Sequence, residues 1–376
     1  MSNSNTTGII TDAHPHTVKK FELIEAYVEA WAHKLLEYGR NTGKCNGLVF
    51  IDCMCNSGVY CDEAGNEVFG TPIRVAKVLA KTMREQQYQR QQAYLYFNDL
   101  SQERIDELKK HLPPETRNFH IYTSVGNGND LLKSIGSKLQ VGQKINYLMV
   151  YDPYTASIDW SAIRPFFNHW GEVIINHMVS DSIRAVPQVK RPEAIDKYEQ
   201  TYLTTIEELL KFGSDRTAYS NRVEQIITAL RRSRNQYYIA AYPFFNTRNA
   251  LVYDLIHCTN SKVGFKLYKS TAWNTFGGQS STKRSKIDPG QMTFNFDDLT
   301  QNYSITTSTD ENCYRPEDIV KYIIDKFNGR SGVPLNEIWD YVDEHPVFPS
   351  DLYKSDIKRI LKERGYKVHR SDIDFI

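Results

Sequence analysis

Short apolar runs and amphipathic segments alternate along the first half of this chain, and this alternation limits its fold more than any other feature. The apolar runs are rich in branched and aromatic side chains: residues 47–52 (GLVFID), 93–98 (AYLYFN), 145–151 (INYLMVY) and 172–177 (EVIINH). Such runs are typical of strands that are buried on both faces. The segments between the runs show helical spacing: residues 71–87, 101–111, 129–139 and 160–170. We therefore expect an α/β domain with a Rossmann-like, doubly wound parallel sheet.

The remaining segments divide the chain into parts. Residues 1–14 are rich in Ser, Asn and Thr, and we expect them to be a disordered tail. Residues 15–276 hold the predicted α/β domain, with a helical insertion at about residues 190–234 near the carboxyl ends of the strands. Residues 277–314 are polar with little periodicity, which predicts a linker. Residues 315–376 carry three helical patterns and strand-like ends, which favours a small winged-helix-like α+β domain.

Composition limits the functions of the chain as a whole. The 46 basic and 45 acidic residues create no global field that would attract nucleic acid or a membrane surface, so such binding needs a local patch. We see neither a signal-peptide pattern nor a run of about 18 apolar residues, which predicts a cytoplasmic protein without membrane contact. The six cysteines include no C-x-x-C pair, so we expect reduced thiols and no metal site.

The turn after the first predicted strand has the form of a nucleotide-binding turn. Residues 52–58 (DCMCNSG) begin with Asp52 and end with Gly58, which lets the backbone approach a ligand, and the next helix would present its N–H groups. Asn56 stands where a G-x-G-x-x-G turn has its first glycine, and asparagine tolerates a positive φ. Asp99 ends the second strand, where an acidic side chain accepts hydrogen bonds from a ribose diol. These four residues are the candidates for binding a nucleotide-like cofactor.

Two later strand ends carry further candidates. Asn127, within residues 126–130 (GNGND), could meet the edge of an adenine ring, although a plain turn capped by Asn129 is an equal alternative. Asp152, Pro153 and Tyr154 follow the third apolar run and form the candidate catalytic loop. A carboxylate beside an aromatic ring can hold a planar amine for group transfer. The alternative for Asp152 is that it caps the end of its strand.

Several sequence blocks resemble, in order, those of the three-Cys-motif partner (TcmP) family, over about residues 15–275. The blocks include FIDCMCNSGVY, FNDLSQERIDELK, YDPYTASIDW, NHMVSDSIR and VYDLIHCTNSKVGFKLYKSTAW. The first turn departs from the family pattern D-G-F-A-G-P-G at Cys53, Cys55, Asn56 and Ser57. The loop at Asp152 is similar to the D/N-P-P-Y/F loop of amino-methyltransferases, with one proline fewer. The resemblance implies a class I methyltransferase-like fold and a partner protein with a three-Cys, radical-SAM-like motif.

The C-terminal domain has a candidate binding surface of its own. Lys354, Lys358, Arg359 and Lys362 lie close together on the third predicted helix of residues 315–376. In a winged helix this element contacts phosphates, which predicts binding of DNA or RNA. Docking of a protein partner is the alternative for the same surface.

Two hypotheses of different classes follow. The first is an S-adenosylmethionine-dependent methyltransferase that binds its cofactor across the 52–58 turn and Asp99. Its acceptor would be a nucleic-acid base or other planar amine near Asp152 and Tyr154. Because the methyl group of a sulfonium is already activated, positioning would matter more than a strong base. The second is a catalytically silent adaptor that brings a partner to nucleic acid, and Asn56 and the shortened loop favour it.

Overall fold

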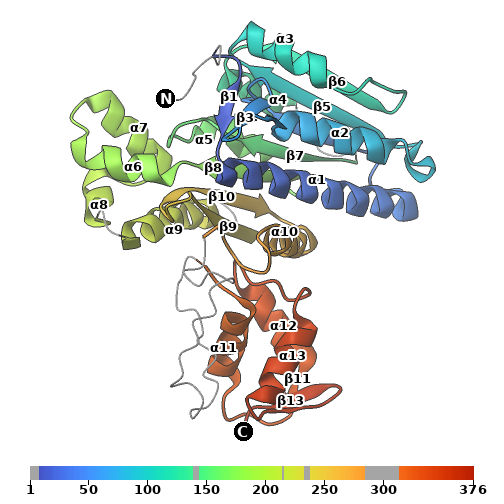
Figure 1. Ribbon diagram of the computed structural model, residues 1–376, viewed down its shortest axis with the longest axis vertical. Helices are drawn as coiled ribbons and strands as arrows, with labels where there is room; N and C mark the ends of the chain where they lie inside the picture. Colours follow the sequence, from blue (N-terminus) through green and yellow to red (C-terminus); the bar gives the residue numbers. More distant parts are fainter. Residues whose placement is uncertain (1–7, 139–143, 214–215, 233–237, 284–312) are drawn as a thin grey trace.

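The structure is a computed structural model that describes residues 8–138, 144–213, 216–232, 238–283 and 313–376. Residues up to 283 form an α/β part, and residues 313–376 form a smaller part at its foot (Figure 1). Among the described residues, every helix is too short or too polar to cross a bilayer.

A seven-stranded mixed sheet forms the centre of the larger part. Its strands are β2 (Gly47–Asp52), β5 (Gln92–Asp99), β6 (Phe119–Val125), β7 (Ile145–Tyr151), β8 (Gly171–His177), β9 (Tyr238–Phe245) and β10 (Leu251–Thr259). Their spatial order is β6-β5-β2-β7-β8-β10-β9. Neighbours from β6 to β8 pair in parallel, whereas β10 is antiparallel to both β8 and β9. The direction of winding changes between β2 and β7, which places a crevice at the carboxyl ends of these strands.

Two large hydrophobic cores cover the two faces of the sheet. Successive strand residues point to opposite faces, so Phe50 belongs to one core and Ile51 to the other. The helices on the first face are α1 (Pro15–Thr42), α2 (Thr71–Met83), α3 (Gln102–His111) and α10 (Lys262–Thr275). Those on the second are α4 (Gly128–Lys138), α5 (Trp160–Ile163), α6 (Val179–Ala185), α7 (Pro192–Tyr202), α8 (Ile206–Lys211) and α9 (Arg216–Arg232). Burial on both faces explains why the strands lack polar alternation.

The helical insertion lies near one edge of the sheet, at the left of Figure 1, where α6 to α9 gather. Within the expected bounds of 190–234 the described residues form three helices, α7, α8 and α9. The helix expected at 160–170 ends at Ile163 and continues only as a 3₁₀ turn, η2 (Arg164–Phe166). Pro165 has no backbone N–H to continue an α-helix, which accounts for the early end.

A small second sheet corrects two expectations, one for the first turn and one for the N-terminal residues. The strands β3 (Val59–Asp62) and β4 (Glu67–Phe69) form a hairpin between the 52–58 turn and α2, so the next helix does not follow the turn directly. Strand β1 (Thr11–Ala13) pairs in parallel with β3, although residues 1–14 were expected to be disordered. Ala13 is buried there, and backbone pairing orders a segment whose composition is polar. Residues 1–7 lie outside the described residues.

The C-terminal part contains the three expected helices and a three-stranded sheet. Its elements are α11 (Pro316–Phe327), β11 (Val333–Pro334), α12 (Leu335–Glu344), α13 (Lys354–Glu363), β12 (Lys367–Val368) and β13 (Asp372–Asp374). The strand order is β11-β13-β12, with antiparallel pairing. Of the expected linker, residues 284–312 lie outside the described residues.

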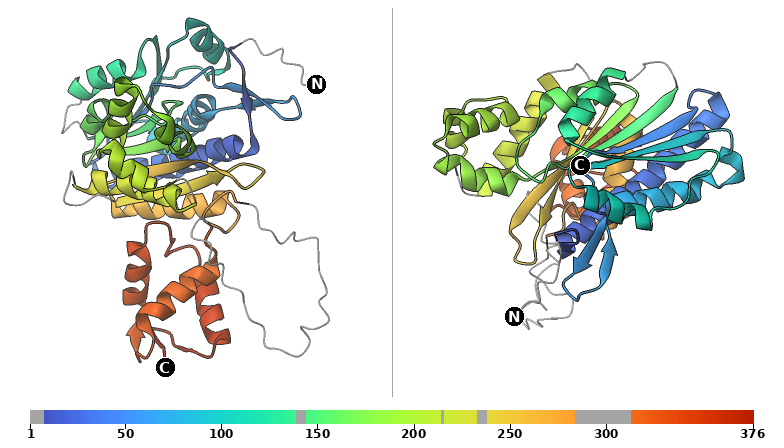
Figure 2. Two further views of the ribbon diagram at one scale, coloured as in Figure 1. Left: turned by 90° about the vertical axis from the view of Figure 1, so that its left-hand side faces the viewer. Right: turned by 90° about the horizontal axis from the view of Figure 1, so that it is seen from above.

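Buried hydrogen bonds fix the C-terminal part against α10 and β9, and both figures show these elements side by side (Figures 1 and 2). Lys269 of α10 is fully buried, and its Nζ donates to the carbonyl oxygens of Asp343 and His345 at 3.0 and 2.9 Å. Trp273 Nε1 and Tyr242 Oη both donate to the carbonyl oxygen of Val347. The two parts therefore share a buried interface.

Candidate functional site

A cleft of about 580 Å³ opens at the carboxyl ends of β2, β5, β6 and β7. Part of its lining directly follows these strands or ends them, as Met54, Asp99 and Asn127 do. Residues 153–155 after β7 form a further wall. Because ligands of open α/β sheets bind where the winding direction changes, this cleft is the candidate functional site.

Asn98 connects the strand ends beneath the cleft by hydrogen bonds. Its buried Nδ2 donates to the carbonyl oxygens of Cys53 at 3.0 Å and Gly126 at 2.9 Å. Its own carbonyl oxygen accepts a hydrogen bond from the backbone N–H of Cys55. The turns after β2, β5 and β6 are thus held together by one amide side chain, which keeps the floor of the cleft rigid.

Asp99 lies in the cleft wall, as the sequence predicted for a ribose ligand. It is only 4% exposed, and its carboxylate accepts hydrogen bonds from the backbone N–H groups of Asn56 at 3.1 Å and Ser101 at 2.9 Å. The guanidinium of Arg104 lies 3.6 Å from the same carboxylate. A carboxylate accepts about four hydrogen bonds, so these partners leave capacity for a diol.

Asp52, Asn56 and Gly58 lie beside the cleft and do not line it. Asn56 has a φ of 59°, in agreement with its place at a glycine position, and Gly58 has a φ of 69°. A Cβ on Gly58 would lie 3.0 Å from Pro72 at the start of α2. The hairpin β3–β4 thus returns the chain to Gly58, and the helix start still meets the turn.

The N-terminal segment covers this turn. The side chain of Asn56 donates to Thr11 Oγ1 at 3.0 Å, and Ser57 Oγ donates to the carbonyl oxygen of Ile9 at 2.8 Å. The side chains of Asn56 and Ser57 are therefore bound within the chain itself. A strand of three residues such as β1 is too short to leave a periodic pattern in the sequence, so this contact could not be predicted.

Asp152 is locked in a buried ion pair and does not line the cleft. Its carboxylate accepts a hydrogen bond from Lys20 Nζ at 2.6 Å and another from Asn176 Nδ2 at 2.7 Å. The side chains of Lys20 and Asp152 are 9% and 14% exposed. The structure therefore differs from the expectation that Asp152 meets a planar amine. Lys20 lies 132 positions away in the chain, so no local pattern signals the pair.

Asp52 lies close to this ion pair. Burial, together with the negative charge of Asp152, raises the pKa of Asp52 to about 7, although the ammonium of Lys20 opposes the shift. One Asp52 oxygen accepts a hydrogen bond from the N–H of Met54 at 3.3 Å. Two carboxylates and one ammonium thus form a buried cluster at the ends of β2 and β7.

Pro153 and Tyr154 do line the cleft. Tyr154 has a φ of 55°, which is unusual for a bulky residue, and its side chain is 48% exposed. Its hydroxyl donates to the carbonyl oxygen of Met54 at 3.0 Å, so the ring connects the loop after β7 to the turn after β2. An exposed ring in this position can stack against a planar ligand.

Asn127 caps the start of α4 and also lines the cleft. Its Oδ1 accepts hydrogen bonds from the N–H groups of Asn129 and Asp130 at the start of α4. The cap is therefore Asn127 and not Asn129. A Cβ on Gly128 would lie 2.5 Å from the carbonyl oxygen of Cys53, so only glycine permits the close approach of α4 to the first turn.

Sequence reasoning missed the polar rim of the cleft. The rim residues come from helices and from the loop before α5: Arg104, Lys133, Asp159, Lys197 and Gln200. Lys133 Nζ lies 2.9 Å from Asp159. Charged residues on exposed helix faces are common, so their spacing alone gives no signal of a site.

Neighbouring acids neutralise part of the basic surface expected on α13. Lys354 pairs with Asp351 at 2.7 Å, and Arg359 pairs with Glu363 at 2.8 Å. Within the described part of the chain, Lys358 and Lys362 form no ion pair. The cationic surface of this helix is therefore smaller than the sequence suggests.

Comparisons with known proteins find similarity at the level of structure only. No family model matches the chain, and no curated protein matches its sequence. A DUF519 protein of Legionella pneumophila is 12% identical, with 68% of this chain and 92% of that chain covered and a TM-score of 0.37. Human methyltransferase-like protein 13, in complex with SAH, is 8% identical, with 74% and 97% covered and a TM-score of 0.32. The SAH-bound methyltransferase PaMTH1 of Podospora anserina is 9% identical, with 63% and 87% covered and a TM-score of 0.28.

Proposed function

We propose that this chain is an S-adenosylmethionine-dependent methyltransferase whose cofactor lies in the cleft at the carboxyl ends of β2, β5, β6 and β7. One observation carries this proposal. The cleft lies where the winding of the sheet changes direction, and Asp99, at the end of the second parallel strand, forms part of its wall. An acidic side chain in that place is suited to a ribose diol.

The residues present fit the adenosine end of the cofactor. Asp99 would accept hydrogen bonds from the ribose, and Asn127, which lines the same cleft, would meet the edge of the adenine ring. Leu100, which is 74% exposed at the rim, offers an apolar surface to a base. The cleft of about 580 Å³ falls within the usual range for sites that bind small molecules.

The methionine end fits less closely. The side chains of Asp52 and Asn56 lie off the cleft, so the first turn contributes mainly Cys53 and Met54. The nearby cluster of Asp52, Asp152 and Lys20 carries a net negative charge when both acids are ionised, which favours a cationic sulfonium over a neutral thioether. When bound, S-adenosylmethionine supplies an activated methyl group.

The chain's own residues would act by positioning. Tyr154 presents a half-exposed ring to the cleft, where a planar acceptor such as a nucleic-acid base can stack. Asp152 is a positioning residue: its ion pair with Lys20 holds the loop that carries Pro153 and Tyr154. Methyl transfer needs the acceptor to be aligned with the methyl group of the cofactor, and the ring of Tyr154 would hold the acceptor and exclude water from it.

Further parts of the proposal concern family and partners. We assign the chain to the TcmP family on its sequence blocks, with a three-Cys-motif, radical-SAM-like protein as partner, in the cytoplasm. The element order α11-β11-α12-α13-β12-β13 and the sheet order β11-β13-β12 support a winged-helix domain. Contact of DNA or RNA with Lys358 and Lys362 of α13 is the corresponding proposal for nucleic acid.

A second candidate function is a catalytically silent adaptor. Two observations favour it: both oxygens of Asp152 are bound within the chain, and the N-terminal strand engages Asn56 and Ser57. An adaptor would retain the fold and the basic helix α13 without binding the cofactor.

Calorimetric titration of the full chain with S-adenosylmethionine distinguishes the two functions. We expect saturable binding to the wild type, weakened about 10- to 100-fold in Asp99→Asn, because a charge-assisted hydrogen bond is lost. Asp106→Asn is the matched control, since Asp106 is an exposed acid on α3 that is paired with Lys109. Binding that is equal in Asp99→Asn and the control would remove Asp99 from the site. A wild type that does not bind would favour the adaptor.

A further inference from the structure

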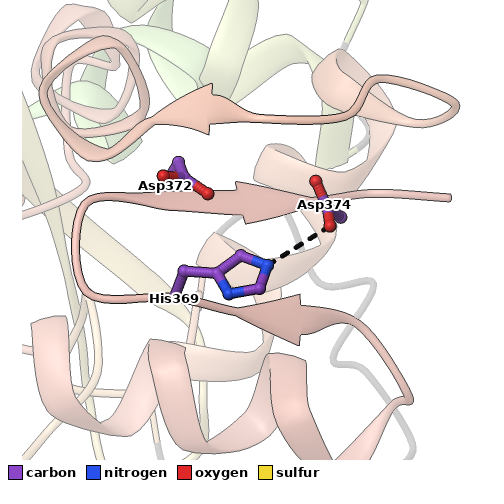
Figure 3. Close-up of side chains that lie close together, drawn as sticks. All are labelled: His369, Asp372 and Asp374. Atoms are coloured by element: carbon purple, nitrogen blue, oxygen red, sulfur yellow. Dashed lines mark hydrogen bonds and ion pairs between the residues drawn. The ribbon is translucent and has the colours of Figure 1, made fainter.

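Three side chains that can bind a metal ion converge on the C-terminal hairpin (Figure 3). The hairpin lies at the end of the molecule away from the central sheet (Figure 1). Asp372 and Asp374 alternate on β13 and so share one face of the strand. His369 follows β12, and its N–H donates to the carbonyl oxygen of Asp372 across the hairpin. One ligand atom from each of the three residues lies within 4.8 Å of the others.

We propose that His369, Asp372 and Asp374 bind a divalent transition-metal ion of the zinc type. One imidazole nitrogen and two carboxylate oxygens are a mixed N/O ligand set, which suits zinc and its neighbours better than calcium or magnesium. A dipositive ion would balance the two carboxylate charges. The remaining coordination positions face solvent, because His369 is exposed and both aspartates are partly exposed.

Hydrogen bonds within the chain orient the carboxylate of Asp374. Its carboxylate accepts hydrogen bonds from Ser331 Oγ at 2.6 Å and from the N–H of Gly332 at 2.7 Å, and it lies 3.3 Å from His369 Nε2. Hydrogen bonds that orient a ligand carboxylate are typical of metal sites.

The position gives the ion a structural use. Asp374 connects β13 to residues 331 and 332, which follow α11, and His369 belongs to the turn of the hairpin. An ion at this point would join the hairpin to the loop before β11. Small domains frequently need such a link, because a short chain buries little apolar surface. On the neighbouring strand β12, the residue opposite Asp374 is the basic residue Lys367.

No metal site was expected, because the six cysteines include no C-x-x-C pair. The ligands here are spaced H-x-x-D-x-D, and only the hairpin shows that all three point to one place. Without the fold, such a segment is indistinguishable from an ordinary polar turn.

Titration of the full chain with zinc, followed by calorimetry, tests the site. We expect saturable binding with a stoichiometry of one. His369→Ala and Asp372→Asn should each weaken it by at least about tenfold, since each removes one of three ligands. Neither change touches Ser331 or Gly332, so the hairpin should stay folded. His111→Ala is the matched control, because His111 lies 3.1 Å from Glu107 but has no third ligand.

Two readouts separate this site from the six cysteines. Cobalt bound by His369 and the aspartates should show no thiolate charge-transfer band, and zinc should raise the unfolding temperature of the wild type but not of His369→Ala. Binding that is unchanged in both variants, a thiolate band, or no binding by the wild type would each overturn the proposal.

Discussion

Lys20→Met tests whether the candidate catalytic loop depends on a buried ion pair. Lys20 Nζ lies 2.6 Å from Asp152, and the two side chains are 9% and 14% exposed. Methionine retains most of the aliphatic side chain but supplies no charge and no donor. Asp152 would then keep only the hydrogen bond from Asn176.

The expected cost follows from the burial of the carboxylate. Removal of one partner from a buried pair leaves an uncompensated charge, which typically lowers the free energy of unfolding by about 3 to 5 kcal/mol. The remaining bond from Asn176 places the expected loss near the lower value. In the double variant with Asp152→Asn the uncompensated charge is gone, so most of the lost stability should return.

Urea unfolding at pH 7 measures these differences, with Lys19→Met as the matched control. Lys19 is the preceding residue, and its pair with Glu22 has side chains that are 45% and 39% exposed. Such surface pairs contribute up to about 1 kcal/mol. A loss in Lys20→Met no larger than that in Lys19→Met would refute the reasoning. Asp152 would then be accessible to solvent and available to an acceptor.

Three further predictions follow from other buried or charged groups. Burial lowers the pKa of Lys269 to about 7, so between about pH 7 and 10 the folded chain binds fewer protons than the unfolded chain. The contribution of Lys269 should therefore make stability rise with pH over this window in the wild type, and Lys269→Met should lack this rise. Burial raises the pKa of Asp254 to about 7, so this residue should lower the stability as the pH rises from about 4 to 7, by up to about 1.4 kcal/mol per unit. Asp254→Asn should remove this contribution in a pH series of denaturant unfolding and leave the similar contribution of Asp52. If α13 contacts phosphates, the double variant Lys358→Glu, Lys362→Glu should reduce the log-log slope of nucleic-acid binding against salt by about two units. A change at Arg359, which is paired with Glu363, should reduce this slope less. Equal slopes for the wild type and the double variant would contradict the contact.

The central strands could be predicted because burial on both faces leaves a continuous apolar run in the sequence. Residues 47–52 and 145–151 agree in their bounds with β2 and β7. The place of Asp99 in the cleft wall could also be predicted, since a strand end in a parallel sheet points to the ligand edge.

The remaining features depend on contacts between distant residues. The pair of Lys20 and Asp152 and the bonds from Lys269 to the C-terminal part leave no periodic pattern, although they determine which side chains are accessible. Strand β1 and the hairpin β3–β4 are too short for a signal based on alternation. Propensity and period describe single elements, whereas these contacts arise only when elements pack.

Hydrogen exchange of the full chain, with and without saturating S-adenosylmethionine, tests the central claim most directly. Cofactor in the cleft should slow exchange in the segments that form its walls, at residues 99–104, 126–133 and 151–161, because bound ligand suppresses local opening. Residues 315–376 should exchange at unchanged rates. Protection confined to the C-terminal part, or no protection at all under conditions where the cofactor is in large excess, would contradict the proposed site.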